Sequence, residues 1–265
     1  MKIIYTDNIT AVTGDSEHAN YPASNVQTQY VKEKWVAEDT DAELLLAVSS
    51  GSGVAVYGTN ATSVTVTVSV GLGAAWAEAG DGHEGAEWGA TGDGHEGADW
   101  VTAATVTTVY DLSGSDVGSL WADYTEYTGS HIVSLQFTAT GENVEAGVVR
   151  SGTVNEFRDP HYGIREGLKD YSIIKELSNG AFYIKKRDVV RTFSFSLLED
   201  RDADFYTFMH DIFMLYGSQP LAWRICSSKN TDWEWVVFCR ADSMPSGSHG
   251  NITDSVISIS LLEVV

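Results

Sequence analysis

Hydrophobic and polar residues alternate along most of the first 150 residues. Residues 64–70 are the clearest case, because four valines alternate there with two threonines and a serine, the two-residue period of a strand with one buried face. Short strands separated by Gly, Ser, Asn and Asp are typical of an all-β sandwich or jelly roll, and this fold is predicted for residues 1–150. The other predicted strands of this region cover residues 44–48, 54–57, 101–110, 132–138 and 144–149.

The second half begins with predicted strands over residues 181–185 and 189–198 and then changes to a helical period. Apolar side chains recur at spacings of three and four residues, which predicts one amphipathic helix. Asp200 or Asp202 can cap the start of this helix, and Gly217 can end it. The apolar stripe of the helix consists of Phe205, Phe208, Met209, Ile212, Phe213 and Tyr216.

Strands resume over residues 221–225, 236–239 and 256–265. This order of elements predicts an α+β domain in which one helix packs on an antiparallel sheet. We assign the α+β domain to residues 151–265 and place the boundary within Arg150–Pro160. The chain as a whole is therefore predicted to be mainly β.

One segment of the first half is an internal repeat. Residues 80–88 (GDGHEGAEW) recur as residues 92–100 (GDGHEGADW), and Trp76, Trp88 and Trp100 keep the 12-residue period. Because the repeat lies between two predicted strands, residues 76–100 are expected to form a long loop or a hairpin extension.

Three interpretations of this duplicated loop stay open. The first is a metal site, in which the carboxylates suit Ca²⁺ and the imidazoles suit Zn²⁺, although the EF-hand pattern is missing. The second is ligand contact, because tryptophans stack on sugar rings while nearby carboxylates bind hydroxyls. The third is a duplicated surface loop that packs on the sandwich or on another subunit. The candidate metal ligands are Asp81, His83, Glu84, Asp93, His95 and Glu96.

Charge separates the two halves and narrows the choice of partners. The formal net charge is −21, and residues 1–149 hold three basic against 21 acidic residues, a net −18. This acidity argues against nucleic acid and against an anionic membrane surface, because both need a basic patch. No segment approaches the roughly 20 apolar residues of a membrane span, and the first residues do not resemble a signal peptide.

Motifs of known catalytic chemistry are not found in the sequence. It has no Gly-x-Ser-x-Gly elbow, phosphate loop or dinucleotide fingerprint, so we expect no catalytic residues and no cofactor beyond the Ca²⁺ considered for the loop. A glycosidase pair of carboxylates about 5–10 Å apart is not visible in a sequence. The two cysteines, Cys226 and Cys239, are expected to be free thiols, with pairing across facing strands as the alternative.

Several short motifs of the first half resemble a known family. Residues 21–26 (YPASNV) followed by Trp35 look like the opening of a galactose-binding-like (discoidin-type) jelly roll. In that family a Pro-Ala-x-Asn turn precedes a core tryptophan. Further matching pieces are residues 118–121, 132–138 and 144–149.

The second half resembles the domain that follows this jelly roll in tail proteins of long-tailed bacteriophages. The matching pieces are residues 160–167, 170–172, Gly180, residues 191–197, Tyr216-Gly217 before Pro220, and residues 256–263. The resemblance implies a non-enzymatic structural component of the tail tip or baseplate, similar to a distal tail protein. Such a protein would be made in the host cytoplasm and reside in the virion tail, with copies of itself and other tail proteins as partners.

The resemblance also implies an orientation and leaves two alternatives open. The near-neutral second half, with the helix stripe from Phe205 to Phe213, is expected to make the assembly contacts, and the acidic jelly roll is expected to face solvent. The first alternative is a carbohydrate-binding module that recognises a host-surface glycan. The second is a glycan hydrolase.

Overall fold

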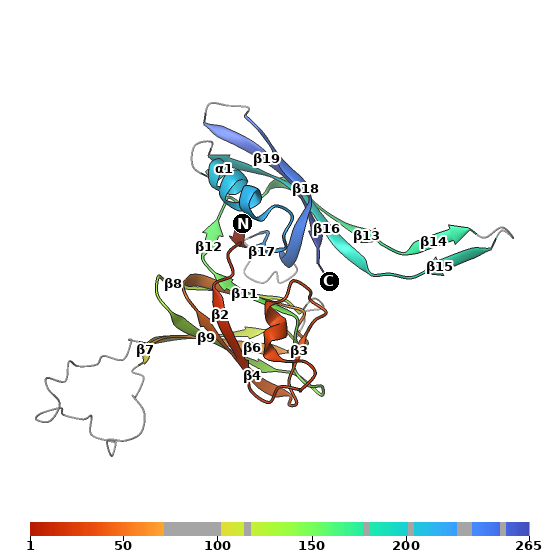
Figure 1. Cartoon of the computed structure of the whole chain (residues 1–265). Helices are drawn as coiled ribbons and strands as arrows, with labels where there is room; N and C mark the ends of the chain where they lie inside the picture. The colour runs from red at the N-terminus through yellow and green to blue at the C-terminus, as the bar shows by residue number, and fades with distance from the viewer. Residues whose placement is uncertain are drawn as a thin grey trace, which may run out of the picture.

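The computed structural model describes residues 1–71, 102–113, 118–176, 181–200, 204–226, 235–249 and 253–264. Antiparallel strands make up most of the molecule, and one helical segment lies on a sheet of the second half (Figure 1). The prediction of a mainly β chain, with a β-sandwich and an α+β part, is confirmed. In the described residues there is no helix that is both long and apolar enough for a membrane crossing.

The first half forms a sandwich of two main sheets. The larger sheet has the order β2-β4-β9-β6-β7 and the smaller one the order β11-β5-β8. The strands of the larger sheet are β2 (Ile9–Gly14), β4 (Asp41–Val48), β9 (His131–Thr138), β6 (Ser63–Gly71) and β7 (Thr102–Asp111). Those of the smaller sheet are β11 (Val148–Gly152), β5 (Gly51–Tyr57) and β8 (Leu120–Tyr127).

The core of the sandwich follows from the alternation in its strands. Leu44, Val64 and Phe137 all point inward and are fully buried. Trp35, on the short strand β3 (Trp35–Val36) that pairs with β10 (Glu145–Ala146), is also fully buried, with its ring 5.8 Å from that of Phe137. The 3₁₀ helix η1 (Ala23–Gln27) precedes this tryptophan, and the Asn25 side-chain amide donates to the Lys34 carbonyl at 2.9 Å. The turn therefore positions the strand that carries the core tryptophan.

The second half contains a sheet of seven strands in the order β12-β1-β17-β18-β19-β16-β13. Strand β1, the first of the chain, lies inside this sheet between β12 and β17, so the sheet combines the start of the chain with its last third. Its strands are β12 (Val154–Glu156), β1 (Lys2–Ile4), β17 (Leu221–Arg224), β18 (Val236–Ser248), β19 (Asp254–Glu263), β16 (Val189–Asp200) and β13 (His161–Asp170).

The helical segment covers one face of this sheet. It begins as α1 (Asp204–Tyr206) and continues as a π-helix, η2 (Thr207–Met214). Phe208 packs its ring against those of Phe157, Phe213 and Trp223 at 5.1–6.4 Å between centroids. The stripe predicted for assembly, with Phe205, Phe208, Ile212 and Phe213 buried and Met209 partly buried, thus packs inside its own subunit. The face left for a partner is the opposite one.

A small apolar cluster joins the two halves, and Arg150 of β11 lies beside it. The cluster includes Ile4, Tyr57 and Phe238, and the rings of the last two are 5.4 Å apart. The Arg150 side chain lies over the Phe238 ring, 5.2 Å from its centroid, and forms an ion pair with Asp7 at 3.5 Å. Its guanidinium donates to the backbone carbonyls of Val26, Thr28 and Val149 at 3.3, 2.6 and 2.8 Å.

Candidate functional site

A two-stranded hairpin projects from the second sheet (Figure 1). Its strands β14 (Ile173–Glu176) and β15 (Phe182–Lys185) pair with each other, and in the described part of the chain neither joins a larger sheet. We call residues 168–189, of which the structure describes 168–176 and 181–189, the arm. They continue β13 outward, pass through β14 and β15 and return to β16. The arm is therefore held by two strands of the sheet at its root only.

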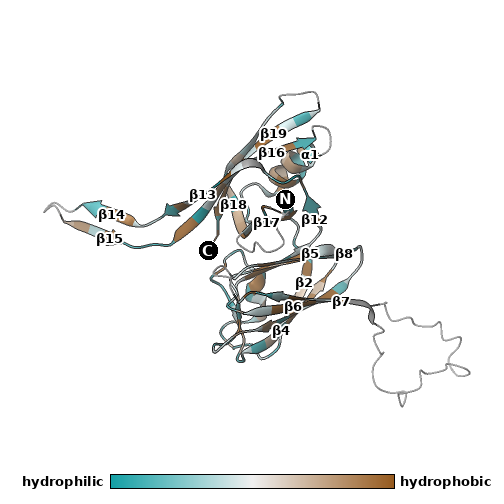
Figure 2. Ribbon diagram, turned by 180° about the vertical axis from the view of Figure 1, so that it is seen from behind, coloured by the Kyte–Doolittle hydropathy of each residue, from teal (hydrophilic) through white to brown (hydrophobic). Residues whose placement is uncertain are grey.

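The arm exposes apolar side chains that a soluble monomer would normally cover. Figure 2 shows hydrophobic stretches along β15. A hairpin of two strands is marginally stable in water unless a further surface packs on it. An apolar, exposed hairpin therefore indicates an interaction site. The exposed apolar side chains of the arm are Leu168, Tyr171, Ile174, Phe182, Tyr183, Ile184 and Val189.

The root of the arm is fixed by ion pairs. Arg191 of β16 and Glu263 of β19 form several hydrogen bonds, the shortest 2.7 Å between Nη2 and Oε1. Burial alone would lower the pKa of Arg191, but the hydrogen bonds and the negative charge of Glu263 outweigh it and raise that pKa. The Lys169 ammonium pairs with Asp242 at 2.9 Å, and this bond raises the lysine pKa. These contacts set the direction in which the arm leaves the sheet.

A second exposed apolar surface lies where the helical segment ends. Met214 and Leu215 are 74% and 72% exposed. Met244 of β18 is also exposed and lies near Gly217, because a side chain added at Gly217 would reach the Met244 methyl group at 3.7 Å. We call Met214, Leu215 and Met244 the helix-end patch.

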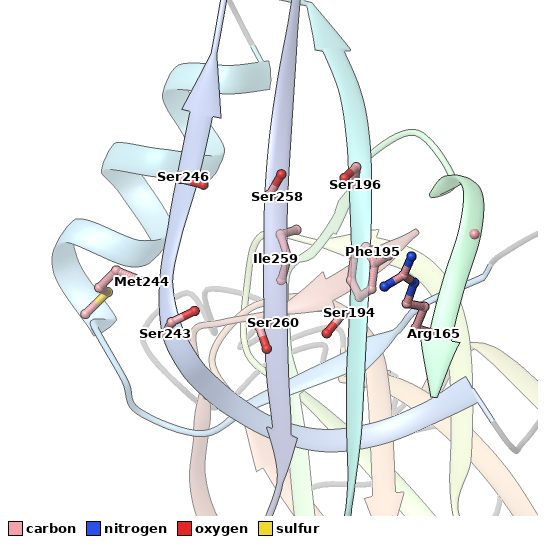
Figure 3. Close-up of a pocket in the computed structure, with 11 residues that line it drawn as sticks. Arg165, Ser194, Phe195, Ser196, Ser243, Met244, Ser246, Ser258, Ile259 and Ser260 are labelled. Atoms are coloured by element: carbon pink, nitrogen blue, oxygen red, sulfur yellow. The ribbon is translucent and has the colours of Figure 1, made fainter. Parts of the chain in front are cut away.

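A shallow hollow of about 400 Å³ lies on the face of the second sheet opposite the helix (Figure 3). Strand register places Ser194 beside Ser260 and Ser196 beside Ser258. Among the residues that line the hollow, none is a carboxylate or a histidine. The lining residues are Gly163, Arg165, Ser194, Phe195, Ser196, Ser243, Met244, Ser246, Ser258, Ile259 and Ser260.

One buried acid lies near the start of the helical segment. The Glu199 side chain is fully buried, and its Oε1 accepts the Arg158 backbone N–H at 2.9 Å. Its Oε2 has no hydrogen-bond partner. Burial raises the pKa of Glu199 to about 7, with a smaller contribution from the charge of Asp204.

The structure describes only some of the sites that were proposed from the sequence. Trp76, Trp88 and Trp100 and the six candidate metal ligands of the duplicated loop lie outside the described residues. Within the described residues, no three or more His, Cys, Asp or Glu side chains come together as a metal site would require. Both cysteines are free thiols, Cys239 buried and Cys226 partly buried.

Sequence reasoning missed the exposure of the arm and of the helix end. Residues 181–185 were predicted as a strand, but a strand pattern is the same in a core and on a projecting hairpin. The cluster Lys185-Lys186-Arg187, which begins at the last residue of β15, was the available signal, because charged residues flank strands that must stay soluble before they bind a partner.

Comparison with known proteins gives no family for this chain. No family model matches the sequence, and no curated protein matches it. One similar solved structure is a mutant of chitosan-binding module 1 from a chitosanase/glucanase of Paenibacillus sp. IK-5, at 15% identity and a TM-score of 0.36, covering 56% of this chain and 98% of that one. Another is CpGH89CBM32-6, produced by Clostridium perfringens, at 14% identity and a TM-score of 0.31, covering 55% and 94%. Both are carbohydrate-binding modules.

Proposed function

We propose that this chain is a non-enzymatic structural subunit of a bacteriophage tail tip or baseplate. It assembles through its second half and directs the acidic sandwich outward. Its partners are copies of itself and other tail proteins, and it resides in the virion tail. The family resemblance of the sequence suggested this role, and the arm is the structural observation that supports it.

The arm supports an assembly role because its composition suits an interface better than an isolated surface. Phe182, Tyr183 and Ile184 follow one another on β15 and are all exposed. Aromatic and aliphatic side chains of this kind supply most of the binding energy when they are buried at a protein–protein interface. The root contacts at Arg191 and Lys169 hold the arm in an extended position before any partner arrives, which lowers the entropic cost of binding.

The first prediction concerns a double substitution in the arm, Phe182→Asp with Ile184→Asp. We expect the wild-type chain, alone or mixed with its tail partners, to form a ring or a complex that light scattering after size exclusion detects. The double variant should stay monomeric, because two charges would have to be buried at the interface. Val109→Asp, at an equally exposed apolar position on β7, is the matched control and should assemble normally. A wild-type chain that stays monomeric with every candidate partner would contradict the proposal.

A carbohydrate-binding module is the second candidate function. The two-sheet architecture of the first half is the observation that favours it, together with the three tryptophans of the repeat. We expect binding on a glycan array to be lost when Trp76, Trp88 and Trp100 are each replaced by Ala, while Trp121→Phe leaves it unchanged. Suitable probes are host-surface polysaccharides and chitosan, the ligand in the name of one similar module. If the wild-type chain binds none of these probes, this candidate is wrong.

A further inference from the structure

We propose that the arm of one copy docks on the helix-end patch of a second copy of the same chain. This inference rests on the proposed assembly role and names the partner surface. The contact is head-to-tail, because the two surfaces that meet are different parts of the same molecule.

The first argument is apolar exposure. Among the large apolar residues that the structure describes, the three most exposed are Leu168, Met214 and Leu215, at 75%, 74% and 72%. Leu168 belongs to the arm, and the other two belong to the helix-end patch. Methionine adapts its shape to irregular partners, so Met214 and Met244 suit a surface that receives the aromatic rings of Phe182 and Tyr183.

The second argument is charge complementarity. The arm, residues 168–189, holds five basic and three acidic residues, a net +2 in a chain of net −21. In the described residues from 200 to 217 the charged side chains are Asp200, Asp204 and Asp211, and none is basic. A basic arm is therefore attracted to the surface around the helix, and opposite charges around an apolar contact favour one docking orientation.

The third argument is geometry. The arm leads away from the helical segment, which lies on the other side of the second sheet (Figures 1 and 2). Strands β14 and β15 therefore do not cover the helix end of their own copy (Figures 1 and 2). Two different surfaces on one chain form a heterologous contact, which repeats from copy to copy and gives a closed ring or an open filament.

Two other surfaces fit the arm less well. A second arm carries the same net positive charge, so an arm-to-arm contact would be repulsive. The sandwich is acidic, but its exposed apolar side chains on β7 and β9, such as Val109 and Ile132, are less exposed than Met214 and Leu215. The helix-end patch combines highly exposed apolar side chains with nearby negative charge, so it fits the arm best.

Cross-linking between two variants, each with one added surface cysteine, tests the contact directly. Tyr183→Cys and Leu215→Cys are purified separately, mixed as full-length chains and treated with a short bismaleimide. We expect a cross-linked dimer that contains one copy of each variant, identified by mass spectrometry. The control mixture pairs Tyr183→Cys with Val109→Cys, and the wild-type chain gives the background from Cys226. Equal yields from the two mixtures would overturn the proposal.

A binding measurement separates this inference from the proposed function. Leu215→Asp should weaken self-association about tenfold or more, as expected for a central interface residue, and added salt should weaken the wild-type contact. Leu215 is exposed, so circular dichroism should show an unchanged fold. If the arm variant fails to assemble while Leu215→Asp assembles like the wild type, the docking site is wrong and the assembly role stands. If the wild type never self-associates, the second copy is not the partner.

Discussion

Arg150→Ala is expected to lower the free energy of unfolding by about 3 kcal/mol. The Arg150 side chain is 10% exposed, donates to three backbone carbonyl oxygens and forms an ion pair with Asp7. Removing it leaves these acceptors without a donor and leaves Asp7 without its cation. Burial raises the pKa of Asp7 and the positive charge of Arg150 opposes that rise, so the variant should also shift the Asp7 pKa further upward.

Denaturant unfolding measures this effect, and Arg158→Ala is the matched control. Arg158 also forms an ion pair with an aspartate, Asp254, at 3.6 Å, but its side chain is 54% exposed. Exposed pairs contribute about 0–1 kcal/mol, so the control should lose little stability. Equal losses for the two variants would show that burial of the Arg150 guanidinium is not what makes it important.

Glu199→Gln is expected to stabilise the protein at pH 8 by roughly 3–3.5 kcal/mol, from about 1.4 kcal/mol for each unit of pKa change between 4.5 and about 7. The Glu199 carboxyl has a pKa of about 7 in the folded chain against an ordinary value of 4.5. Burial is the main cause, because ionising the carboxyl places a charge where Oε2 has no hydrogen-bond partner. Glutamine has nearly the same shape as the neutral acid and never ionises.

The pH dependence of this effect has a definite sign. Between pH 4.5 and about 7 the folded chain keeps a proton on Glu199 that the unfolded chain has released. The contribution of Glu199 to stability therefore falls as pH rises through this window and is constant above it. The difference between the variant and the wild type should be small below pH 4.5 and reach its full value above pH 7.

Unfolding curves over a range of pH test this prediction, with Glu126→Gln on the exposed edge of β8 as the control. The control should show no rise in stability over the same range. A difference between Glu199→Gln and the wild type that does not change from pH 4 to pH 8 would mean that Glu199 keeps an ordinary pKa in the folded chain.

The alternation of residue types predicted strands β6, β9, β16 and β19, but it missed β8 and β13, although these have eight and ten residues. Each of the four predicted strands has a stretch in which a buried valine, leucine, isoleucine or phenylalanine recurs at every second position. The sequence alone shows this alternation. The stretches are residues 64–68, 133–137, 193–197 and 257–261. Strands β1 and β12 have three residues each, too few for a period. Their place in the sheet depends on partners far along the chain.

The helix shows a second limit of sequence reasoning. The stripe of Phe205, Phe208, Ile212 and Phe213 correctly predicted one buried face, since period alone identifies such a face. It did not say whether the covering surface belongs to the same chain or to another. The sheet of the same chain covers it. Met214 and Leu215, between Phe213 and Tyr216 of the stripe, stay exposed.

The position of β1 has a consequence for the order of events during synthesis. Ile3 pairs with Asn155 on one side and with Trp223 on the other. One edge of β1 therefore stays unpaired until a strand some 220 residues later in the chain has been synthesised. At about 5–20 residues per second this delay is roughly 10–45 s. During that time the nascent chain has an open β edge, of the kind that pairs wrongly with other chains. Completion of the seven-stranded sheet is thus a late step, and the negative charge of the sandwich, which is complete before it, favours solubility of the unfinished chain.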